Sequence, residues 1–322
     1  MKNTLIIFAV LITPFYTALA EHKVFDVDNE INYKEPWYNK AKSEEENFKR
    51  IISGLSATTA GKLILQKASA KAAQRGLTLS DIIAVGEGSL TDTTLVRKFS
   101  AVNPNQVTYE TRSKVYLNRH LTTLDAMLDF AHELTHFTYR EAFNPYDSHF
   151  SLKDFIKSTV EGRGGEVDAF MVECRVLREL MPTTSANNPS CSRLYDKTTG
   201  STSKVLGVQE FYKVGRHFDL FKKDLEKFSL NEKDLPEASP AEAYFISSAW
   251  GLPYPVAAIK EYTNIMDKVC RNDQNRLTLL QNKLARAPAS ANADEYDQRN
   301  SQLSYQTMFE DFKVRCKKFA SN

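Results

Sequence analysis

The chain has 322 residues, of which 42% are hydrophobic and 25% are charged, so it can bury one large core or two smaller ones. Its 42 basic and 40 acidic residues nearly cancel, which gives no reason to expect a nucleic acid or an anionic membrane as a partner. Together with the absence of repeats and low-complexity tracts, these figures exclude a fibrous or low-complexity protein and indicate a globular one.

The first twenty residues have the pattern of an export signal. Lys2 supplies the positive charge, residues 5–11 are apolar, and Ala18-Leu19-Ala20 is a small-residue cleavage site. The apolar stretch is too short to cross a bilayer. We therefore expect a signal peptide over residues 1–20 and an exported, periplasmic or extracellular protein that is not inserted in a membrane after cleavage. The mature chain would begin at Glu21.

Residues 21–104 are expected to form an N-terminal, mostly helical region. Residues 21–50 are polar and aromatic, and the sequence leaves open whether they are an ordered arm or a pro-segment. From Phe48 to about Arg75 the apolar residues recur at helical spacing, and Gly76 ends the pattern. A short element over residues 78–83 and a glycine-containing loop over residues 86–88 follow.

A β-rich region comes next. Residues 107–111 and 114–118 both alternate between polar and apolar side chains and are rich in β-branched and aromatic types, which predicts two strands. They lie directly before the helix that carries the main motif of the chain. The edge of such a strand can hold an extended peptide, although an ordinary core strand is an equally good interpretation.

That motif is His132-Glu133-Leu134-Thr135-His136, within a stretch whose apolar residues have the spacing of an amphipathic helix. His132 and His136 project from the same side of the helix, one turn apart, and can hold one Zn²⁺ ion. Glu133 points about 100° away around the helix. There it can accept the proton of an attacking water. The pattern therefore predicts zinc as a cofactor and metal-assisted hydrolysis. A surface helix with two solvated histidines is disfavoured by the apolar neighbours Phe130, Ala131 and Leu134.

A catalytic zinc needs a third protein ligand. A helix is expected over residues 152–160, then a glycine cluster, then a helix over residues 166–181 that Pro182 stops. We prefer Glu166 in the first turn of that last helix, because a short loop can direct it back to the metal. Glu161 and His149 are the alternatives. Glu173, two turns beyond Glu166, is a candidate hydrogen-bond partner of the ligands.

With Glu166-Val167-Asp168-Ala169-Phe170, the motif resembles the zincin superfamily on its glutamate-ligand (gluzincin) branch, over about residues 105–182. This stretch is also similar to ImmA/IrrE-type metallopeptidases. The resemblance implies a zincin-like catalytic core, bound zinc and hydrolysis of a peptide or protein substrate. It implies His132, His136 and Glu166 as metal ligands and Glu133 as the general base. Two positions depart from related families, since Tyr139 stands where metzincins have Gly and Phe170 stands where an acidic residue often follows the Ala.

Other candidate site residues follow from position alone. Tyr139 continues the metal-facing stripe of the helix, so we expect it to donate a hydrogen bond to the oxyanion of the reaction. His149, Arg163 and Tyr244 are alternatives for that role. Hydrogen-bond partners of the histidine ligands are expected to be Asp129 or Asp168. Three histidines lack ligand spacing and are interpreted as structural or surface residues: His22, His120 and His217.

Four cysteines in an exported chain predict two disulfides. We favour the pairs nearest in sequence, Cys174–Cys191 and Cys270–Cys316. The first pair would brace the helix that presents Glu166. The second would join the last two long helices as a hairpin.

Residues 183–322 are expected to form a C-terminal helical region packed on the core. A Ser-, Thr- and Asn-rich loop over residues 183–204 would precede helices at about 205–228, 240–249, 254–285 and 297–319. The fold class is therefore α+β and helix-rich. The sequence predicts an exported zinc metallopeptidase, with a non-catalytic zincin-like module or a hydrolase of a cell-wall bond as alternatives. It leaves the substrate and the oligomeric state open.

Overall fold

The structure is a computed structural model, and it describes residues 31–147, 149–286 and 294–319. The expected signal peptide over residues 1–20 and His22 lie outside these ranges. The chain divides into two units, residues 1–30 and residues 31–322, and all described residues belong to the second unit. Among the described helices, none is both long enough and apolar enough to cross a membrane.

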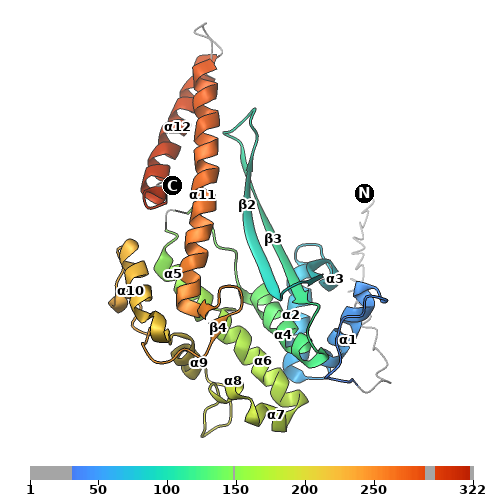
Figure 1. Cartoon of the computed structure of the whole chain (residues 1–322). Coiled ribbons are helices and arrows are strands. Elements are labelled where there is room, and N and C mark those ends of the chain that lie inside the picture. Colours follow the sequence, from blue (N-terminus) through green and yellow to red (C-terminus); the bar gives the residue numbers. More distant parts are fainter. Residues whose placement is uncertain (1–30, 148, 287–293, 320–322) are drawn as a thin grey trace, which may run out of the picture. The chain divides into compact units, whose positions relative to one another are not determined.

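The elements follow one another along the chain as drawn in Figure 1. The first part contains α1 (Glu44–Ser56), α2 (Thr59–Ala73), α3 (Leu79–Ile82), β1 (Ile83–Gly86), β2 (Leu90–Phe99) and β3 (Val107–Asn118). The middle part contains α4 (Thr123–Tyr139), α5 (Leu152–Val160), α6 (Glu166–Leu180), α7 (Pro182–Asn187) and α8 (Pro189–Ser192). The last part contains α9 (Lys204–Phe211), η1 (Gly215–His217), α10 (Phe218–Lys227), η2 (Glu232–Asp234), β4 (Ile246–Ser247), β5 (Leu252–Pro253), α11 (Tyr254–Arg286) and α12 (Asp294–Cys316).

The main sheet has three strands in the order β1-β3-β2. β3 lies in the centre, parallel to β1 and antiparallel to β2, with which it forms a long hairpin. The expectation that residues 21–104 are mostly helical is therefore wrong for residues 83–99. Polar and apolar residues do not alternate along β2, whose sequence is Leu-Thr-Asp-Thr-Thr-Leu-Val-Arg-Lys-Phe. The reason is that this strand belongs to a hairpin that is partly exposed to solvent. The two strands expected over 107–111 and 114–118 are one continuous strand.

Helix α4 lies against the sheet and between other helices, in contact with β2, β3, α2 and α6. It begins after Thr122, whose hydroxyl accepts a hydrogen bond from the Asp125 backbone N–H at 3.2 Å. The apolar face expected for the motif helix is buried, as Phe130, Ala131 and Leu134 are fully inaccessible to solvent. This packing fixes the axial rotation of α4, and therefore the direction in which its histidines point.

A second core joins α5, α6, α9, α10 and α11. The helix expected over residues 205–228 is interrupted at Gly215, which has a positive φ of 54°. The helix expected over residues 240–249 is absent. Directly before this segment, the backbone of Ser239 bonds to Tyr212 and Val214. Within the segment, Ile246 lies in strand β4. The expected loop over residues 183–204 contains two short helices, α7 and α8.

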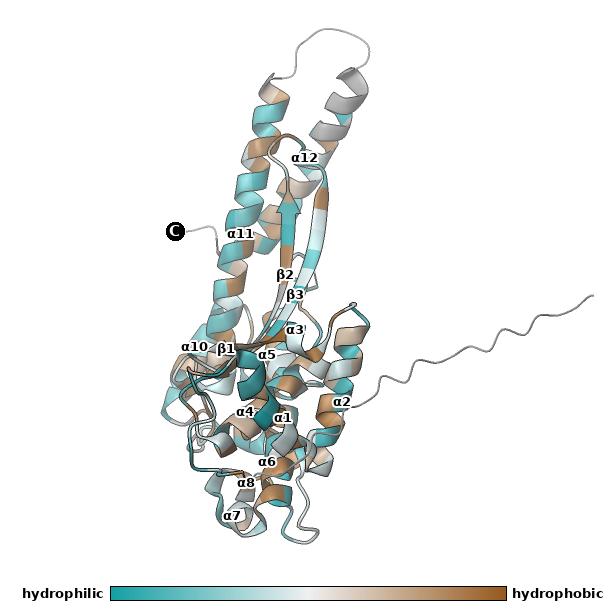
Figure 2. Ribbon diagram, turned by 90° about the vertical axis from the view of Figure 1, so that its right-hand side faces the viewer, coloured by the Kyte–Doolittle hydropathy of each residue, from teal (hydrophilic) through white to brown (hydrophobic). Residues whose placement is uncertain are grey.

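Helices α11 and α12 form the expected hairpin. Figure 2 shows apolar residues recurring at intervals along α11 among hydrophilic ones, as expected for a helix with one buried face. Both predicted disulfides are formed: Cys174–Cys191 with Cα atoms 5.4 Å apart, and Cys270–Cys316 with Cα atoms 5.7 Å apart. The helix expected over residues 152–160 is confirmed as α5, and the helix-rich α+β class is confirmed.

Candidate metal centre

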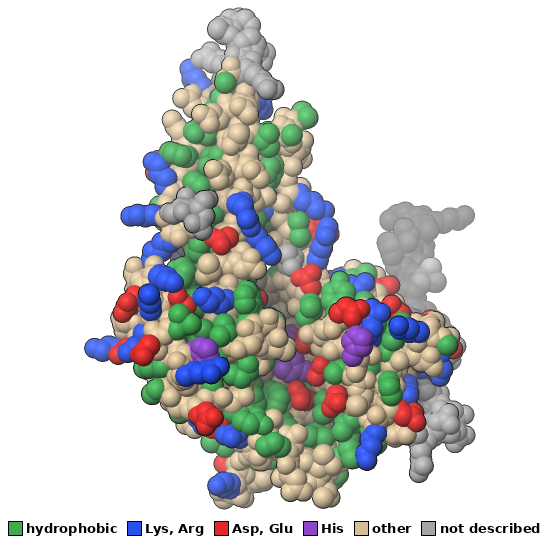
Figure 3. Space-filling view, in the orientation of Figure 1, with side chains coloured by type: hydrophobic (Ala, Val, Ile, Leu, Met, Phe, Trp, Pro, Cys, Tyr) green, Lys and Arg blue, Asp and Glu red, His purple; other side chains and the backbone are tan. Residues whose placement is uncertain are grey.

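Two helices bring three metal-ligating side chains together. His132 and His136 come from α4 and Glu166 from the first residue of α6, and one ligand atom of each lies within 4.8 Å of the others. Nε2 of His132 is 3.4 Å from Oε2 of Glu166, and Nε2 of His136 is 3.5 Å from Oε1. In the space-filling view, histidine and acidic side chains are visible together at the bottom of a hollow near the middle of this face (Figure 3).

These separations fit a tetrahedral cation site. Zinc binds imidazole nitrogen and carboxylate oxygen at about 2.0–2.2 Å, so ligand atoms at two corners of the tetrahedron lie roughly 3.4 Å apart. The two His-to-Glu166 distances have this length, although they involve the two different oxygens of the carboxylate. Two imidazoles and one carboxylate are also the ligand set of a hydrolytic zinc centre that keeps one position open. The residues present therefore fit the metal that the motif predicts.

The other ring nitrogen of each histidine is engaged. Nδ1 of His132 is 3.3 Å from Oε2 of Glu173 on α6, and Nδ1 of His136 is 2.8 Å from the carbonyl oxygen of Gly164. A neutral imidazole that donates from Nδ1 presents the lone pair of Nε2. Both lone pairs then face Glu166.

The expected partners Asp129 and Asp168 do not make these contacts. The carboxylate of Asp168 accepts from the Gly164 backbone N–H at 3.0 Å and pairs with Lys204 at 2.8 Å, so it fixes the loop whose carbonyl holds His136. Asp129 is hydrogen-bonded to Ser89. The candidates Asp129 and Asp168 are therefore not the direct partners, whereas Glu173, the other candidate, contacts His132 as expected, and a backbone carbonyl contacts His136.

The glycine cluster between α5 and α6 explains how this carbonyl reaches α4. Gly164 has a φ of +72°, and a Cβ atom there would lie 2.7 Å from the backbone nitrogen of Arg140 and from Cβ of Tyr139. Only glycine combines that backbone conformation with such a close approach. The loop can therefore pass directly over the C-terminal end of α4, where the carbonyl oxygen of Gly164 reaches Nδ1 of His136.

The electrostatics of the cluster favour a cation. Burial lowers the pKa of His132, but the carboxylates of Glu166 and Glu173 outweigh burial and hold this pKa well above its usual range. Burial likewise raises the pKa of Glu166, but the two histidines outweigh it and hold that pKa well below its usual range. Two largely buried carboxylates thus lie on either side of the His132 ring, Glu166 at Nε2 and Glu173 at Nδ1, and favour positive charge between them.

Glu133 occupies a different environment from the three candidate ligands. Its side chain is largely buried, and the hydroxyl oxygen of Thr91 on β2 lies 2.7 Å from its Oε2 atom. The same hydroxyl is 2.8 Å from the Glu133 backbone carbonyl oxygen. The edge strand therefore contacts the candidate base directly.

Three residues near the cluster have no recognisable signal in the sequence. Tyr254, the first residue of α11, lies near Glu166; burial and the carboxylates of Glu166, Glu173 and Glu133 hold its pKa well above its usual range. Nη2 of Arg140 is 3.4 Å from Oε1 of Glu166. Glu261, further along α11, lies close enough to Arg140, Glu166 and His136 for their charges to act on its carboxyl, whose pKa is raised by burial. Only the tertiary fold brings α11 to α4 and α6.

Most alternative site residues lie elsewhere. The ring of Tyr139 is covered by the cations of Lys67 and Arg163, with their charged atoms 5.3 and 5.1 Å from its centroid. Tyr244 contacts Ser190 and Arg193. Neither tyrosine makes a contact with the cluster among the described residues.

The other ligand alternatives are also separate from the cluster. His149 is 93% exposed and bonds to Asp147, and Glu161 accepts from the Tyr212 hydroxyl at 3.4 Å. As expected, His120 and His217 are outside the cluster; His120 pairs with Glu87.

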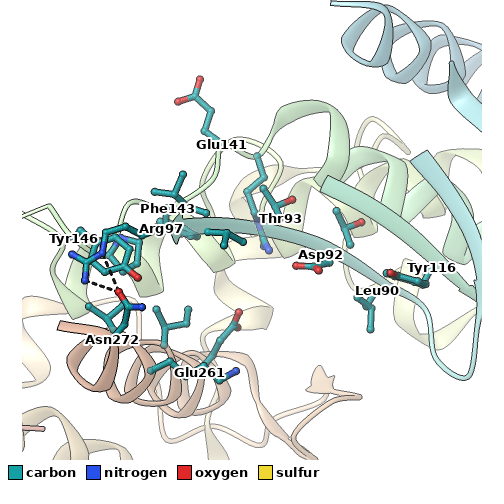
Figure 4. A pocket seen from close by; sticks show the side chains of 18 residues that line it. Leu90, Asp92, Thr93, Arg97, Tyr116, Glu141, Phe143, Tyr146, Glu261 and Asn272 are labelled. Atoms are coloured by element: carbon teal, nitrogen blue, oxygen red, sulfur yellow. Dashed lines mark hydrogen bonds between the residues drawn. The ribbon is translucent and has the colours of Figure 1, made fainter. Parts of the chain in front are cut away.

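A cavity of about 650 Å³, whose lining is drawn in Figure 4, lies beside residues that contact the cluster. Thr91 and Arg140, which contact Glu133 and Glu166, are among its lining residues. Its walls come from β2, from residues 140–146 and from α11.

Comparison of the chain with protein-family models, with curated proteins and with solved structures finds no match.

Proposed function

We propose that this chain is an exported zinc-dependent metallopeptidase with a zincin-like catalytic core. His132, His136 and Glu166 would hold the zinc, and Glu133 would be the general base. The observation that carries the proposal is the convergence of both Nε2 atoms on the Glu166 carboxylate at 3.4 and 3.5 Å, beside a buried glutamate that is not part of the ligand set. A purely structural metal site has no use for that additional carboxylate.

Zinc at this position would supply a Lewis acid that polarises the substrate carbonyl and makes water more acidic. Glu133 accepts the proton of the attacking water on its carboxylate. It then delivers this proton to the amine nitrogen of the breaking peptide bond, because that nitrogen must be protonated to leave.

Thr91 is placed to assist Glu133 in both protonation states. When the carboxylate is ionised, the Thr91 hydroxyl can donate to Oε2 at 2.7 Å. When Oε2 carries the proton, the hydroxyl oxygen can accept from it and donate its own hydrogen to the backbone carbonyl at 2.8 Å, which can only accept. One side chain on β2 therefore holds the base in position throughout the proton transfer.

Tyr254 is the best-placed donor for the oxyanion. A tyrosine hydroxyl is protonated at neutral pH, so it can donate a hydrogen bond. Its contact with Glu166 places it at the cluster, whereas the ring of Tyr139 lies between two cations. We therefore assign to Tyr254 the role first expected of Tyr139.

The substrate would bind along β2. The strand expected to offer an edge was the one directly before the motif helix, but that strand, β3, pairs with β1 on one side and with β2 on the other. β2 pairs only with β3 among the described strands, and its Thr91 touches Glu133. An extended peptide can therefore add to the edge of β2 and pass the base.

Export is supported by the signal-like pattern of residues 1–20 and by two disulfides, which persist in oxidising compartments. The substrate is a peptide or an unfolded protein segment, because only an extended chain fits an edge strand.

The proposal is tested with the mature protein, wild type and Glu133→Gln, incubated with casein and with a mixture of short peptides. Products are identified by mass spectrometry and bound zinc by elemental analysis. We expect equal zinc in both proteins and peptide-bond cleavage by the wild type alone. Equal zinc with no cleavage by either protein would contradict the peptidase and favour a binding module or a hydrolase of another bond.

A further inference from the structure

The cavity beside the cluster runs along the free edge of β2. Its lining includes Leu90 to Thr93 and Leu95 to Arg97, which are consecutive residues and so point alternately to both faces of the sheet. A cavity against one face would be lined by every second residue. From Thr91 to Arg97 this cavity therefore follows the strand edge, where backbone groups are available for pairing, and at Leu90 it also reaches Tyr116 of β3.

One end of the cavity is separated from the cluster by single side chains, which line the cavity and also contact Glu133 or Glu166. These side chains are Thr91 and Arg140. Figure 4 shows Glu261 on α11, across from the strand β2 that carries Asp92 and Thr93. A peptide that pairs with β2 at Thr91, beside Glu133, would therefore continue along the strand into the cavity.

The other end is closed by a clamp, which we define as Arg97, Asn272, Asp273 and Tyr146. The Arg97 guanidinium crosses from β2 to α11, where it bonds to Asn272 Oδ1 at 3.0 Å and pairs with Asp273. Tyr146 stacks on it at 3.8 Å, and Arg315 from α12 bonds to the other oxygen of Asp273 at 2.6 Å. The side chains of Arg97 and Asp273 are 4% and 0% exposed, so no open channel passes between them.

A further contact lies beyond the clamp. Arg276 on α11 donates to the carbonyl oxygen of Pro104, in the turn of the β2–β3 hairpin, at 2.8 Å. The hairpin is therefore attached to α11 at two successive points. An extended chain that enters from the cluster cannot continue past either of them.

The charge of the cavity indicates which end of a peptide enters. The two arginines of the lining are already paired, Arg97 with Asp273 and Arg140 with Glu166. The other charged residues of the lining are three acids, Asp92, Glu141 and Glu261, and one base, Lys268, so acidic side chains are in excess. The cavity therefore favours binding of an ammonium group over a carboxylate.

We propose that the amino-terminal segment of the substrate occupies this cavity, so that the enzyme cleaves only near the amino terminus of a peptide. From Thr91 to Arg97 an extended strand covers about 20 Å, which accommodates roughly six residues. The inference rests on the proposed peptidase function and specifies its substrate: short peptides, or the free amino-terminal ends of longer chains.

The test uses a mixture of random-sequence peptides of about 14 residues, with free or acetylated amino termini, and the mature zinc-loaded protein. Mass spectrometry counts the residues released before each cut, and Glu133→Gln is the blank. We expect cuts within about the first six bonds and a loss of rate of about tenfold on acetylation. Amidation of the carboxyl terminus should have no effect.

A variant that shortens the cavity gives an independent readout. Ile265 lines the cavity on α11, seven residues before Asn272 and therefore about 10 Å from the clamp. Ile265→Trp should restrict the cuts to about the first three bonds. Leu303→Trp on α12, an equivalent change at a residue that is 64% exposed, should leave the distribution unchanged.

Different results would contradict the position of cleavage and the peptidase activity itself. Cuts that depend on Glu133 but fall evenly along the peptides, or cluster at the carboxyl terminus, would overturn the inference and leave the peptidase intact. An unchanged cut distribution in Ile265→Trp would also overturn it. The absence of any cleavage that depends on Glu133 would overturn the proposed function itself.

Discussion

The hydroxyl oxygen of Thr91 lies 2.7 Å from Oε2 of Glu133 and 2.8 Å from the backbone carbonyl oxygen of the same residue. This contact ties the edge strand β2 to the motif helix α4 at the residue that would move the proton. In the proposed mechanism, substrate binding and proton transfer would share this side chain.

Thr91→Val keeps the shape of the side chain and removes the hydroxyl. A hydrogen bond to a charged group contributes about 1.5–3 kcal/mol, so we expect kcat for peptide cleavage to fall about 10- to 100-fold while bound zinc stays unchanged. Thr91→Ser retains the hydroxyl and should restore most of the rate. A valine variant with wild-type kcat would show that Glu133 does not use this contact.

Gly164→Ala should weaken zinc binding. The added Cβ would meet the backbone of Arg140 and displace the carbonyl that holds His136, and loss of such a partner typically lowers metal affinity about 10- to 100-fold. Gly76→Ala is the matched control, because Gly76 has nearly the same φ of +70° but no atom within 4 Å of the added Cβ. Zinc affinity, measured by competition with a chelator, should differ between the two variants. Equal affinities would contradict the assigned role of the loop.

Tyr254→Phe removes the proposed oxyanion donor. We expect kcat to fall about 10²- to 10³-fold with little change in KM, because the hydrogen bond forms only in the transition state. Tyr139→Phe removes a hydroxyl from a ring that lies between Lys67 and Arg163, and should change kcat less than about threefold. The opposite order of the two effects would return the role to Tyr139.

Asp129→Asn should stabilise the metal-free protein at high pH only. Burial raises the pKa of this carboxyl from 3.8 to about 6, so folding favours its protonated form. The resulting penalty is absent below pH 3.8, grows as the pH rises, and is complete above about pH 6, where it reaches up to about 3 kcal/mol. Urea unfolding in chelator should therefore show a gain in the free energy of unfolding at about pH 8 and none near pH 3.5. The exposed control Asp311→Asn should show no such difference.

The sequence predicted the parts of the site that depend on local spacing. His132 and His136 are four residues apart on one helix, and Glu166 follows a glycine cluster, so their convergence could be inferred from the chain alone. The same holds for the two disulfides, which join the cysteines nearest in sequence. The α5 boundaries were also correct, because its apolar face and the glycine cluster that follows it are local signals.

Long-range contacts could not be inferred. Thr91 and Tyr254 reach the cluster from a strand and a helix far away in the chain, and nothing in their neighbours indicates this. β2 was missed because both faces of the hairpin carry polar side chains, which removes the alternation that marks a strand. The partner of His136 is a backbone carbonyl, which every residue possesses and no sequence pattern identifies.

The central claim is that one zinc ion is held by His132, His136 and Glu166. The most direct measurement is the metal content of the purified mature protein by elemental analysis, for the wild type and for Glu166→Gln, with Glu179→Gln as a control glutamate on the same helix that bonds to the start of α2. We predict one zinc per chain in the wild type and in the control, and loss of most of it in Glu166→Gln. A wild type without stoichiometric metal, or a Glu166→Gln variant with full zinc, would contradict the account.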